Sequence, residues 1–306
     1  MRPCLTLLLL ATAVLIPAGA PAAAIDDLAQ QEARLATIGW RLTSGGARWC
    51  PELAPQPGWI LGDPRRFDKR ERAAAKLAYG VSGDGPFVAA VAPGSPAERA
   101  GLARGTAIAA IDGQPVPTLG DEPTVRIDAV QVMLAAREPS APLSVADEGG
   151  RHYELGASPG CASGFRIEQS GKQAAANGKL VRLTLRLAAS VVADDELAAV
   201  VAHELAHNIL RHPAQLAANR SVEAIRGNEI EADRLSVWLL ADAGYDPRSA
   251  IRFWERHKKP LIRAATHPPR RERIAAIEAE IEAMAAARTT DPAARPPLVA
   301  ALAPLE

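Results

Sequence analysis

Two histidines four residues apart, His203 and His207, lie in a segment that the sequence pattern predicts to be one helix. Asp194 and Asp195 provide capping chemistry at its beginning, and the predicted helix runs to about His212. The apolar frame around the two histidines consists of Leu197, Val200, Val201 and Ile209. Because residues four apart share a helical face, both imidazoles can hold the same metal ion.

Glu204 follows the first of these histidines, where its carboxylate can reach a water molecule beside the metal. A Zn²⁺ ion lowers the pKa of such a water toward ~7, so that the carboxylate can take its proton during attack on a carbonyl group. Given six histidines in the chain, this spacing arises by chance in roughly one such chain in a hundred. We therefore predict one zinc ion per chain, with Glu204 as the general base.

A catalytic zinc ion requires a third protein ligand, which should be a histidine or a carboxylate from another helix. The helix predicted over about 222–242 offers Glu229 and Asp233, one turn apart. This pair resembles the Glu-x-x-x-Asp element that follows His-Glu-x-x-His in the M48 family of zinc metallopeptidases. The resemblance implies that Glu229 is the third ligand and that Asp233 accepts an N–H from a ligand histidine. Glu231 is the competing candidate, but it points about 200° away from Glu229 on the helix.

The resemblance to M48 covers about residues 165–288, and the amphipathic helix predicted over 25–42 is a further candidate part. The other segments that carry the resemblance are Asp195–Val200, Arg211-His212, Ala243–Pro247 and Thr266–Pro268. The resemblance implies that His267 lies near the zinc ion, where it contacts substrate or blocks the open coordination position; helix capping from a loop is the alternative. His212 is interpreted as a packing or capping residue at a helix end. Two further helices are predicted over about 247–254 and 274–287.

The candidates for stabilising the oxyanion of a tetrahedral intermediate are Arg270, Arg271, Arg273 and Tyr245. An exposed helix face is the alternative for the arginines, and packing is the alternative for the tyrosine.

Residues 180–187 alternate between apolar and polar side chains, which predicts an antiparallel or edge strand. In zinc peptidases of this helix type, the substrate lies extended along an edge strand, and we assign that role to this segment.

A second pattern precedes this region. It consists of Val91–Ala97, Ala100-Gly101-Leu102, Gly105 and Ile111-Asp112-Gly113. These motifs resemble a PDZ domain of the bacterial type over about 76–157, with Thr106 in place of the usual Asp. Strands are predicted at 87–91, 107–111, 142–145 and 152–155, and a helix at 124–136. The resemblance implies peptide binding by strand addition, with the peptide carboxylate held by backbone N–H groups of Tyr79, Gly80 and Val81. A structural module without a peptide is the alternative.

Near the start of the chain, one charged residue, Arg2, is followed by an apolar run over 5–16 and small residues to Ala24, which predicts a signal peptide cleaved before Ile25. The run is too short to span a membrane. We expect an exported, periplasmic or otherwise extracytoplasmic protein without strong membrane association after cleavage. An uncleaved N-terminal membrane anchor is the alternative.

After cleavage of the signal peptide, the chain keeps two cysteines, Cys50 and Cys161, which flank the PDZ-like insert. We predict that they form a disulfide, which closes a loop of about 110 residues. Two unpaired buried cysteines are the alternative.

The expected parts of the chain are a signal peptide (1–24), a helix with a linker (25–75), the PDZ-like domain (76–157), the peptidase domain (158–288) and a flexible tail (289–306). Within the second part, the Gly- and Pro-rich segment 43–63 is predicted to be a loop. The expected fold class is α+β: a mainly helical zincin-type domain with a small sheet, plus the small β-rich domain.

The charge balance, 35 Lys and Arg against 35 Asp and Glu, argues against a nucleic-acid partner, which requires a net basic face. We predict a zinc endopeptidase that acts on envelope polypeptides in protein quality control, with the PDZ-like domain recognising free C-termini or gating access. One alternative is a PDZ-centred peptide-binding or chaperone-like protein whose zinc site is latched, with His267 as the latch. The other is a structural protein with a fortuitous motif.

Overall fold

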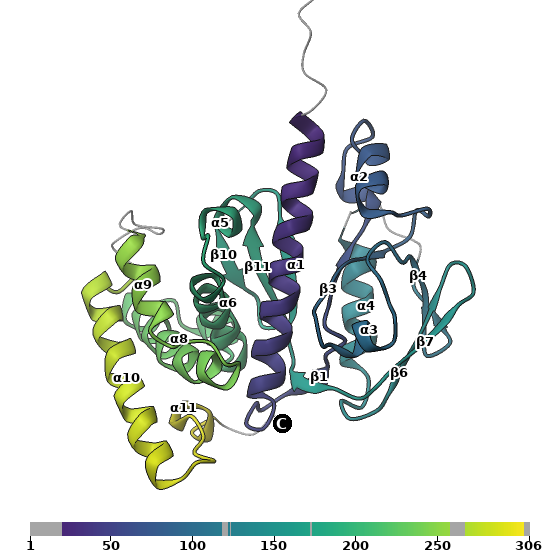
Figure 1. Cartoon of the computed structure of the whole chain (residues 1–306). Helices are drawn as coiled ribbons and strands as arrows, with labels where there is room; N and C mark the ends of the chain where they lie inside the picture. The colour runs from purple at the N-terminus through teal and green to yellow at the C-terminus, as the bar shows by residue number, and fades with distance from the viewer. Residues whose placement is uncertain (1–19, 118–121, 123, 172, 258–266, 303–306) are drawn as a thin grey trace, which may run out of the picture.

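The computed structural model describes residues 20–117, 122, 124–171, 173–257 and 267–302. Helix α1 (Ala20–Gly46) runs through the middle of the molecule and separates a helical half (residues 164–302) from a β-rich half (residues 56–157) (Figure 1). Its periodic apolar residues are all buried: Ile25, Leu28, Leu35, Ile38 and Leu42. The amphipathic helix predicted over 25–42 is confirmed, and α1 supports both halves.

The helical half is built around two long antiparallel-packed neighbours, α6 (Asp194–Ile209) and α8 (Val222–Asp242). Helix α10 (Arg270–Thr290) packs against α8 and α9 (Ser249–Arg256). The shorter helices are α5 (Leu185–Ser190), α7 (His212–Ala218) and α11 (Pro297–Ala300). The sheet contains β9 (Gly164–Glu168), β10 (Ala174–Ala176) and β11 (Leu180–Thr184) in the order β10-β11-β9.

The strand predicted over 180–187 is wrong in two respects. Strand β11 ends at Thr184, whose hydroxyl accepts a hydrogen bond from the Leu187 N–H and begins α5. Leu187 is buried in the helix, so its apolar character continued the alternation without continuing the strand. In addition, β11 is the middle strand and not an edge strand. It pairs antiparallel with β10, as one of the two alternatives predicts, but parallel with β9, and the edges of the sheet are β10 and β9.

The β-rich half has its own hydrophobic core. Its sheets are β5-β4-β6-β7 and β2-β3, formed by β2 (Trp59–Gly62), β3 (Phe87–Val91), β4 (Ile108–Ile111), β5 (Gln114–Pro115), β6 (Leu143–Asp147) and β7 (His152–Leu155). The helices are α2 (Arg72–Tyr79), α3 (Pro96–Arg99) and α4 (Val125–Ala135), with a 3₁₀ turn at Pro64–Arg66. The strands predicted at 87–91 and 152–155 therefore appear with these bounds, and the other two strands and the helix appear with bounds shifted by one or two residues.

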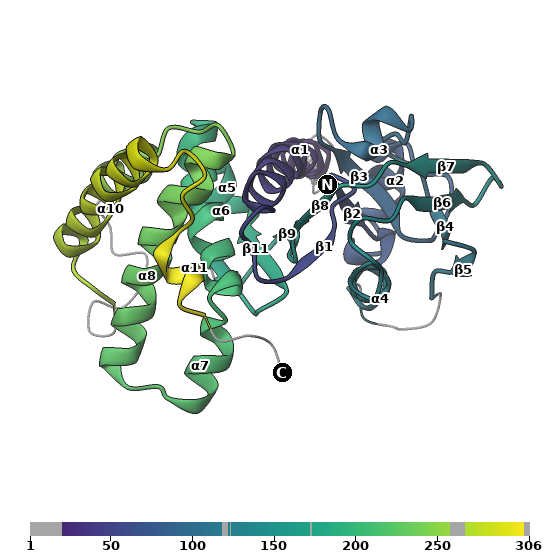
Figure 2. The same cartoon turned by 90° about the horizontal axis from the view of Figure 1, so that it is seen from below.

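The prediction of a loop over 43–63 is wrong, because the segment contains the end of α1, β1 (Leu53–Pro55) and β2. Trp59 and Leu61 belong to the core of the β-rich half, so this unit begins before residue 76. Strand β1 pairs with β8 (Pro159–Cys161), and Cys50 and Cys161 form the predicted disulfide. The β1–β8 pair and the disulfide thus join the beginning of the PDZ-like insert to its end, next to α1. Figure 2 shows β1, β8 and β9 where the two halves meet.

The tail predicted to be flexible over 289–306 is ordered as far as the structure describes it. Helix α10 extends to Thr290, and Leu298, Val299 and Leu302 pack against the large core. At the other end, residues 1–19 of the predicted signal peptide lie outside the described residues, and 20–24 are the first residues of α1. Among the helices that are described, none combines the length and the apolar character needed to cross a membrane.

Candidate metal centre and active site

The side chains of His203, His207 and Glu229 meet where α6 packs against α8. The Nε2 atoms of the two histidines are 3.1 Å apart, and each lies 3.5 Å from one carboxylate oxygen of Glu229. Ligands of a tetrahedral zinc ion with bonds of about 2.0–2.1 Å are separated by about 3.3 Å. The two imidazoles and one carboxylate therefore have both the chemistry and the spacing of a zinc site that keeps one position open.

Asp233 and Arg273 fix the orientation of this cluster. His203 Nδ1 lies 3.0 Å from Asp233 Oδ1, which is the position that the M48 resemblance implies for Asp233. Arg273 donates to both oxygens of Asp233 at 2.6 Å, and its Nη1 lies 3.1 Å from Glu229. Its guanidinium also lies 4.1 Å from the centre of the Trp254 ring. Arg273 is thus a buried side chain that binds two carboxylates and also lines the pocket described below, so the exposed helix face is wrong and the oxyanion role stays a prediction.

Charges and burial shift the pKa values in this cluster. Burial raises the pKa of the half-buried Glu204 carboxyl to about 7, and the negative charge of Glu229 acts in the same direction. Burial acts to raise the pKa of Glu229 as well, but hydrogen bonding to His203 and the Arg273 charge hold it well below its usual range. The pKa of His207 lies well below its usual value because the ring is buried and His203 is close. His207 is therefore held neutral, the form that binds metal ions.

His212 and Glu231 form a second contact chain that begins at His207. The Nδ1 atoms of His207 and His212 are 2.9 Å apart, and His212 Nε2 lies 3.1 Å from Glu231 Oε2. Glu231 therefore turns away from the metal cluster, as its helical position predicts. The end of α6 is also earlier than predicted, at Ile209, and His212 is the first residue of α7. Sequence reasoning gave His212 a packing or capping role and missed its contact with His207.

The cluster opens into a pocket of about 1050 Å³ between the edge strand β10 and the helices α6, α8, α9 and α10. Its apolar wall includes Leu187, Val200, Ala250, Phe253 and Trp254, while Gln173–Asn177 form the wall at the sheet edge. His267 also lines the pocket, with its Nε2 3.9 Å from a carboxylate oxygen of Glu229. This position is next to the metal cluster, as the resemblance implies for His267.

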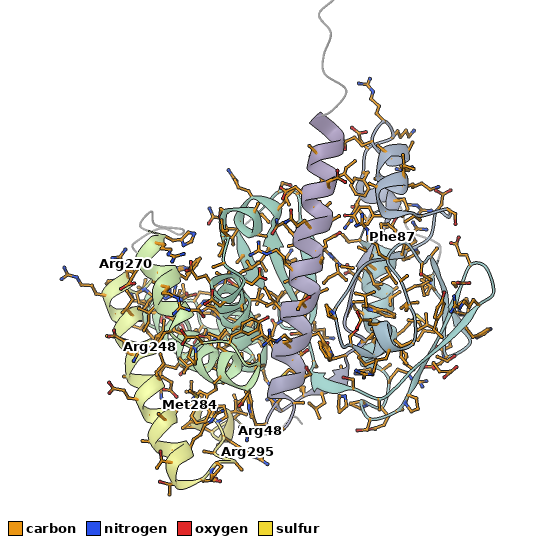
Figure 3. All side chains as sticks on the ribbon, in the orientation of Figure 1. Arg48, Phe87, Arg248, Arg270, Met284 and Arg295 are labelled. Carbon is orange, nitrogen blue, oxygen red and sulfur yellow. A yellow bond between two sulfur atoms is a disulfide. The ribbon has the colours of Figure 1, made fainter. Side chains whose placement is uncertain are left out.

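The remaining oxyanion candidates take different positions. Arg270 lies at the N-terminal end of α10 (Figure 3). It is exposed and is one of the residues that line the pocket. Arg271 is exposed and is not among the residues that line the pocket. Tyr245 packs against α1, with the guanidinium of Arg41 4.1 Å from its ring centre, so the packing alternative describes it.

The structure does not support a carboxylate-binding loop at Tyr79-Gly80-Val81. Tyr79 is the last residue of α2, and its buried hydroxyl donates to Glu32 at 2.6 Å. Gly80 ends the helix with φ 73°, and its N–H donates to the carbonyl of Leu77. The N–H of Val81 donates to Lys76 in the same way. These N–H groups already have partners within the helix end, so they are not free to hold a peptide carboxylate.

A helix with two histidine donors, a carboxylate donor from a neighbouring helix and a pocket bordered by a sheet edge together define a site of the metallopeptidase class. Comparison with known proteins agrees: segments 173–226 and 214–281 match the model of peptidase family M48, and residues 87–146 match that of the PDZ domain. Residues 173–281 are therefore an M48 peptidase domain, which follows a PDZ domain in the chain.

One similar curated protein is the mitochondrial metalloendopeptidase OMA1 of Schizosaccharomyces pombe. It is 33% identical to this chain over a region that covers 28% of this chain and 36% of OMA1. The chain thus matches only about a third of the length of this relative.

Proposed function

We propose that this protein is a zinc-dependent endopeptidase. The observation that carries the proposal is the convergence of His203, His207 and Glu229 at the floor of a pocket whose wall is the edge strand β10. When bound, zinc supplies Lewis-acid polarisation of the scissile carbonyl and makes a water molecule more acidic. Glu204 follows His203 and lines the same pocket, where its carboxylate would act as the general base toward a water molecule and would return the proton to the leaving amine. Asp233 and Arg273 hold His203 and Glu229 in place for this step.

The sheet edge favours extended polypeptides as substrates. In an antiparallel pair, successive residues alternate between facing the partner strand and facing away from it. Gln173 and Asn177 bond to β11, so Ala175 also faces β11, while the backbone groups of Ala174 and Ala176 face away. An unfolded substrate can therefore pair with Ala174 and Ala176 as an added strand beside the metal cluster.

We place this activity outside the cytoplasm, on envelope proteins and in protein quality control. The N-terminal sequence has the pattern of a signal peptide, and the disulfide between Cys50 and Cys161 is typical of an oxidising compartment. An extended, edge-paired substrate must be locally unfolded, which matches misfolded polypeptides better than compact ones. For the PDZ domain we propose that it gates access to the sheet β10-β11-β9, because Asp128 of its helix α4 forms an ion pair with Arg166 of β9.

A second candidate function is a PDZ-centred binding or chaperone-like protein with a latched zinc site. The position of His267 favours it, because its Nε2 is 3.9 Å from Glu229 and the ring lines the same pocket. A histidine this close to the three donors is a further candidate ligand, which would fill the position that a catalytic zinc ion keeps open.

The test is cleavage of an unfolded protein by zinc-loaded wild type and by Glu204→Gln, with Glu282→Gln, an exposed position on α10, as the matched control. We expect cleavage by wild type and by the control, and a rate about 10²–10⁴-fold lower for Glu204→Gln at unchanged zinc content. A zinc-loaded wild type that cleaves nothing would favour the latched binder. A wild type that binds no zinc would end the metallopeptidase account.

A further inference from the structure

His212 is a fully buried histidine that lies behind the metal cluster rather than in it. It is 0% exposed, and its ring centre is 4.9 Å from that of His207, at an angle of 74°. The contact joins the two Nδ1 atoms at 2.9 Å, whereas the Nε2 of His207 faces His203 and Glu229. His212 therefore touches a candidate metal ligand on the side opposite to the metal.

A specific backbone conformation makes this contact possible. In one continuous helix, residues 207 and 212 would point about 140° apart, and their rings would not meet. Helix α6 instead ends at Ile209, and Arg211 adopts the left-handed conformation with φ 59°. This conformation is unfavourable for a residue with a Cβ atom. It redirects the chain so that α7 begins with His212 beneath His207.

The atoms permit a single consistent arrangement of protons. A neutral His207 that offers Nε2 to a metal carries its hydrogen on Nδ1, which then donates to Nδ1 of His212. His212 must in turn carry its own hydrogen on Nε2, and this donates to Glu231 at 3.1 Å. The chain of donors therefore runs from the metal cluster outward and ends on a carboxylate.

Helix α8 thus supplies three carboxylates at alternate positions, each with a different task. Glu229 faces the metal cluster, and Asp233 accepts from His203 directly. Glu231 points away from that face and reaches the second histidine only through His212. Asp233 is enclosed and paired with Arg273, whereas the Glu231 side chain is 42% exposed.

We propose that His212 is a positioning residue for the ligand His207, and that Glu231 fixes the tautomer of His212. The proposal rests on the zinc site of the proposed function, but it concerns zinc affinity and not peptide hydrolysis. Partners of this kind orient the ligand ring and increase its basicity, and their loss weakens metal binding by about 10–100-fold.

The experiment measures the zinc dissociation constant of the full chain by competition with a chromogenic chelator. We expect His212→Phe to weaken zinc binding about 10–100-fold, because the acceptor for the His207 N–H is lost. His212→Asn should recover most of the affinity, because its Oδ1 takes the place of Nδ1. His152→Phe, at an exposed position on β7, is the matched control and should bind zinc as wild type does. A purely structural role for His212 would not produce recovery by asparagine.

Glu231→Ala provides a second arm in case His212→Phe does not fold, since this side chain is partly exposed. We expect weaker zinc binding for Glu231→Ala, and affinity close to wild type for Glu231→Gln, which keeps an acceptor oxygen. Folded His212→Phe or Glu231→Ala protein with wild-type zinc affinity would overturn the proposal. Absence of zinc binding in the wild type itself would instead contradict the proposed function, so the two failures are distinguishable.

Discussion

At the scale of single residues, the candidate site depends on buried charges that compensate one another. Arg273 is 4% exposed and lies between Asp233 and Glu229, so one cation faces two carboxylates. Removing one member of a buried ion pair leaves an uncompensated charge in a medium of low polarity, which costs far more than an exposed pair contributes. Arg273 is therefore as important for the shape of the site as the candidate ligands are.

We predict that Arg273→Met lowers the free energy of unfolding of the zinc-free protein by about 3–5 kcal/mol, because Asp233 and Glu229 lose the buried arginine that they share. Arg271→Met, on an exposed position of the same helix, should change it by less than about 0.5 kcal/mol. Chemical denaturation followed by circular dichroism measures both. Equal stability of the two variants would show that the buried pair does not hold the site together.

The sequence predicts residues whose relation is set by a single helix and misses those set by the path of the chain. His203, Glu204 and His207 share one helix, so their spacing alone places them relative to one another. His212 depends on the left-handed conformation of Arg211, for which no glycine gives a signal. The position of the Arg273 side chain depends on how α10 packs against its neighbours. The local sequence around a buried arginine on a helix does not differ from that around an exposed one.

At the scale of secondary-structure elements, the proposed binding of polypeptides depends on β10. It is three residues long, pairs with β11 on one side and lines the pocket. It also packs along α6, which carries the histidines. A short edge strand of this kind offers unpaired backbone groups at a fixed height above the metal cluster.

We predict that Ala174→Pro or Ala176→Pro lowers kcat/KM for an unfolded protein substrate by about 2- to 10-fold, because one outward N–H is lost. Zinc content and stability should not change. Ala175→Pro is the matched control, since its N–H faces β11, and this variant should lose stability. Unchanged kcat/KM in both outward-facing variants would mean that substrates do not pair with β10.

Long helices were predictable because their apolar periodicity is strong, and α6, α8 and α10 appear close to the expected positions. Short elements were not. Thr184 caps α5 where the alternation of the preceding strand continues, and β1 and β2 lie in a segment whose glycines and prolines are typical of a loop. The order of strands in the small sheet depends on long-range pairing of β9 with β11, which local patterns do not encode.

At the scale of the whole molecule, the PDZ domain contacts the sheet β10-β11-β9 directly. Asp128 of α4 forms an ion pair with Arg166 of β9, and Gln131 lies against the backbone at Gly164. All four residues of β2 are buried, and this strand packs against α1 and β9. Strand β3 is paired with β2 on one side and with residues 105–107 on the other. The strands that a peptide would extend are thus covered by the chain itself.

We therefore predict that the full chain does not capture free C-termini in this conformation. A fluorescent peptide with a free C-terminal carboxylate should show no saturable binding by anisotropy, corresponding to a Kd weaker than about 1 mM. The same peptide with an amidated C-terminus is the control. Saturable binding in the micromolar range that disappears on amidation would show that the domain opens a carboxylate site which this conformation closes.

The central claim is that one zinc ion at His203, His207 and Glu229 makes this chain an endopeptidase. The most direct test removes metal from the full chain with a chelator, returns zinc in steps and follows cleavage of an unfolded protein by mass spectrometry of the fragments. We predict cuts at internal peptide bonds whose rate rises linearly with zinc and levels off at about one ion per chain. Internal cleavage that persists without zinc, or a fully loaded chain that leaves the substrate intact, would contradict the account.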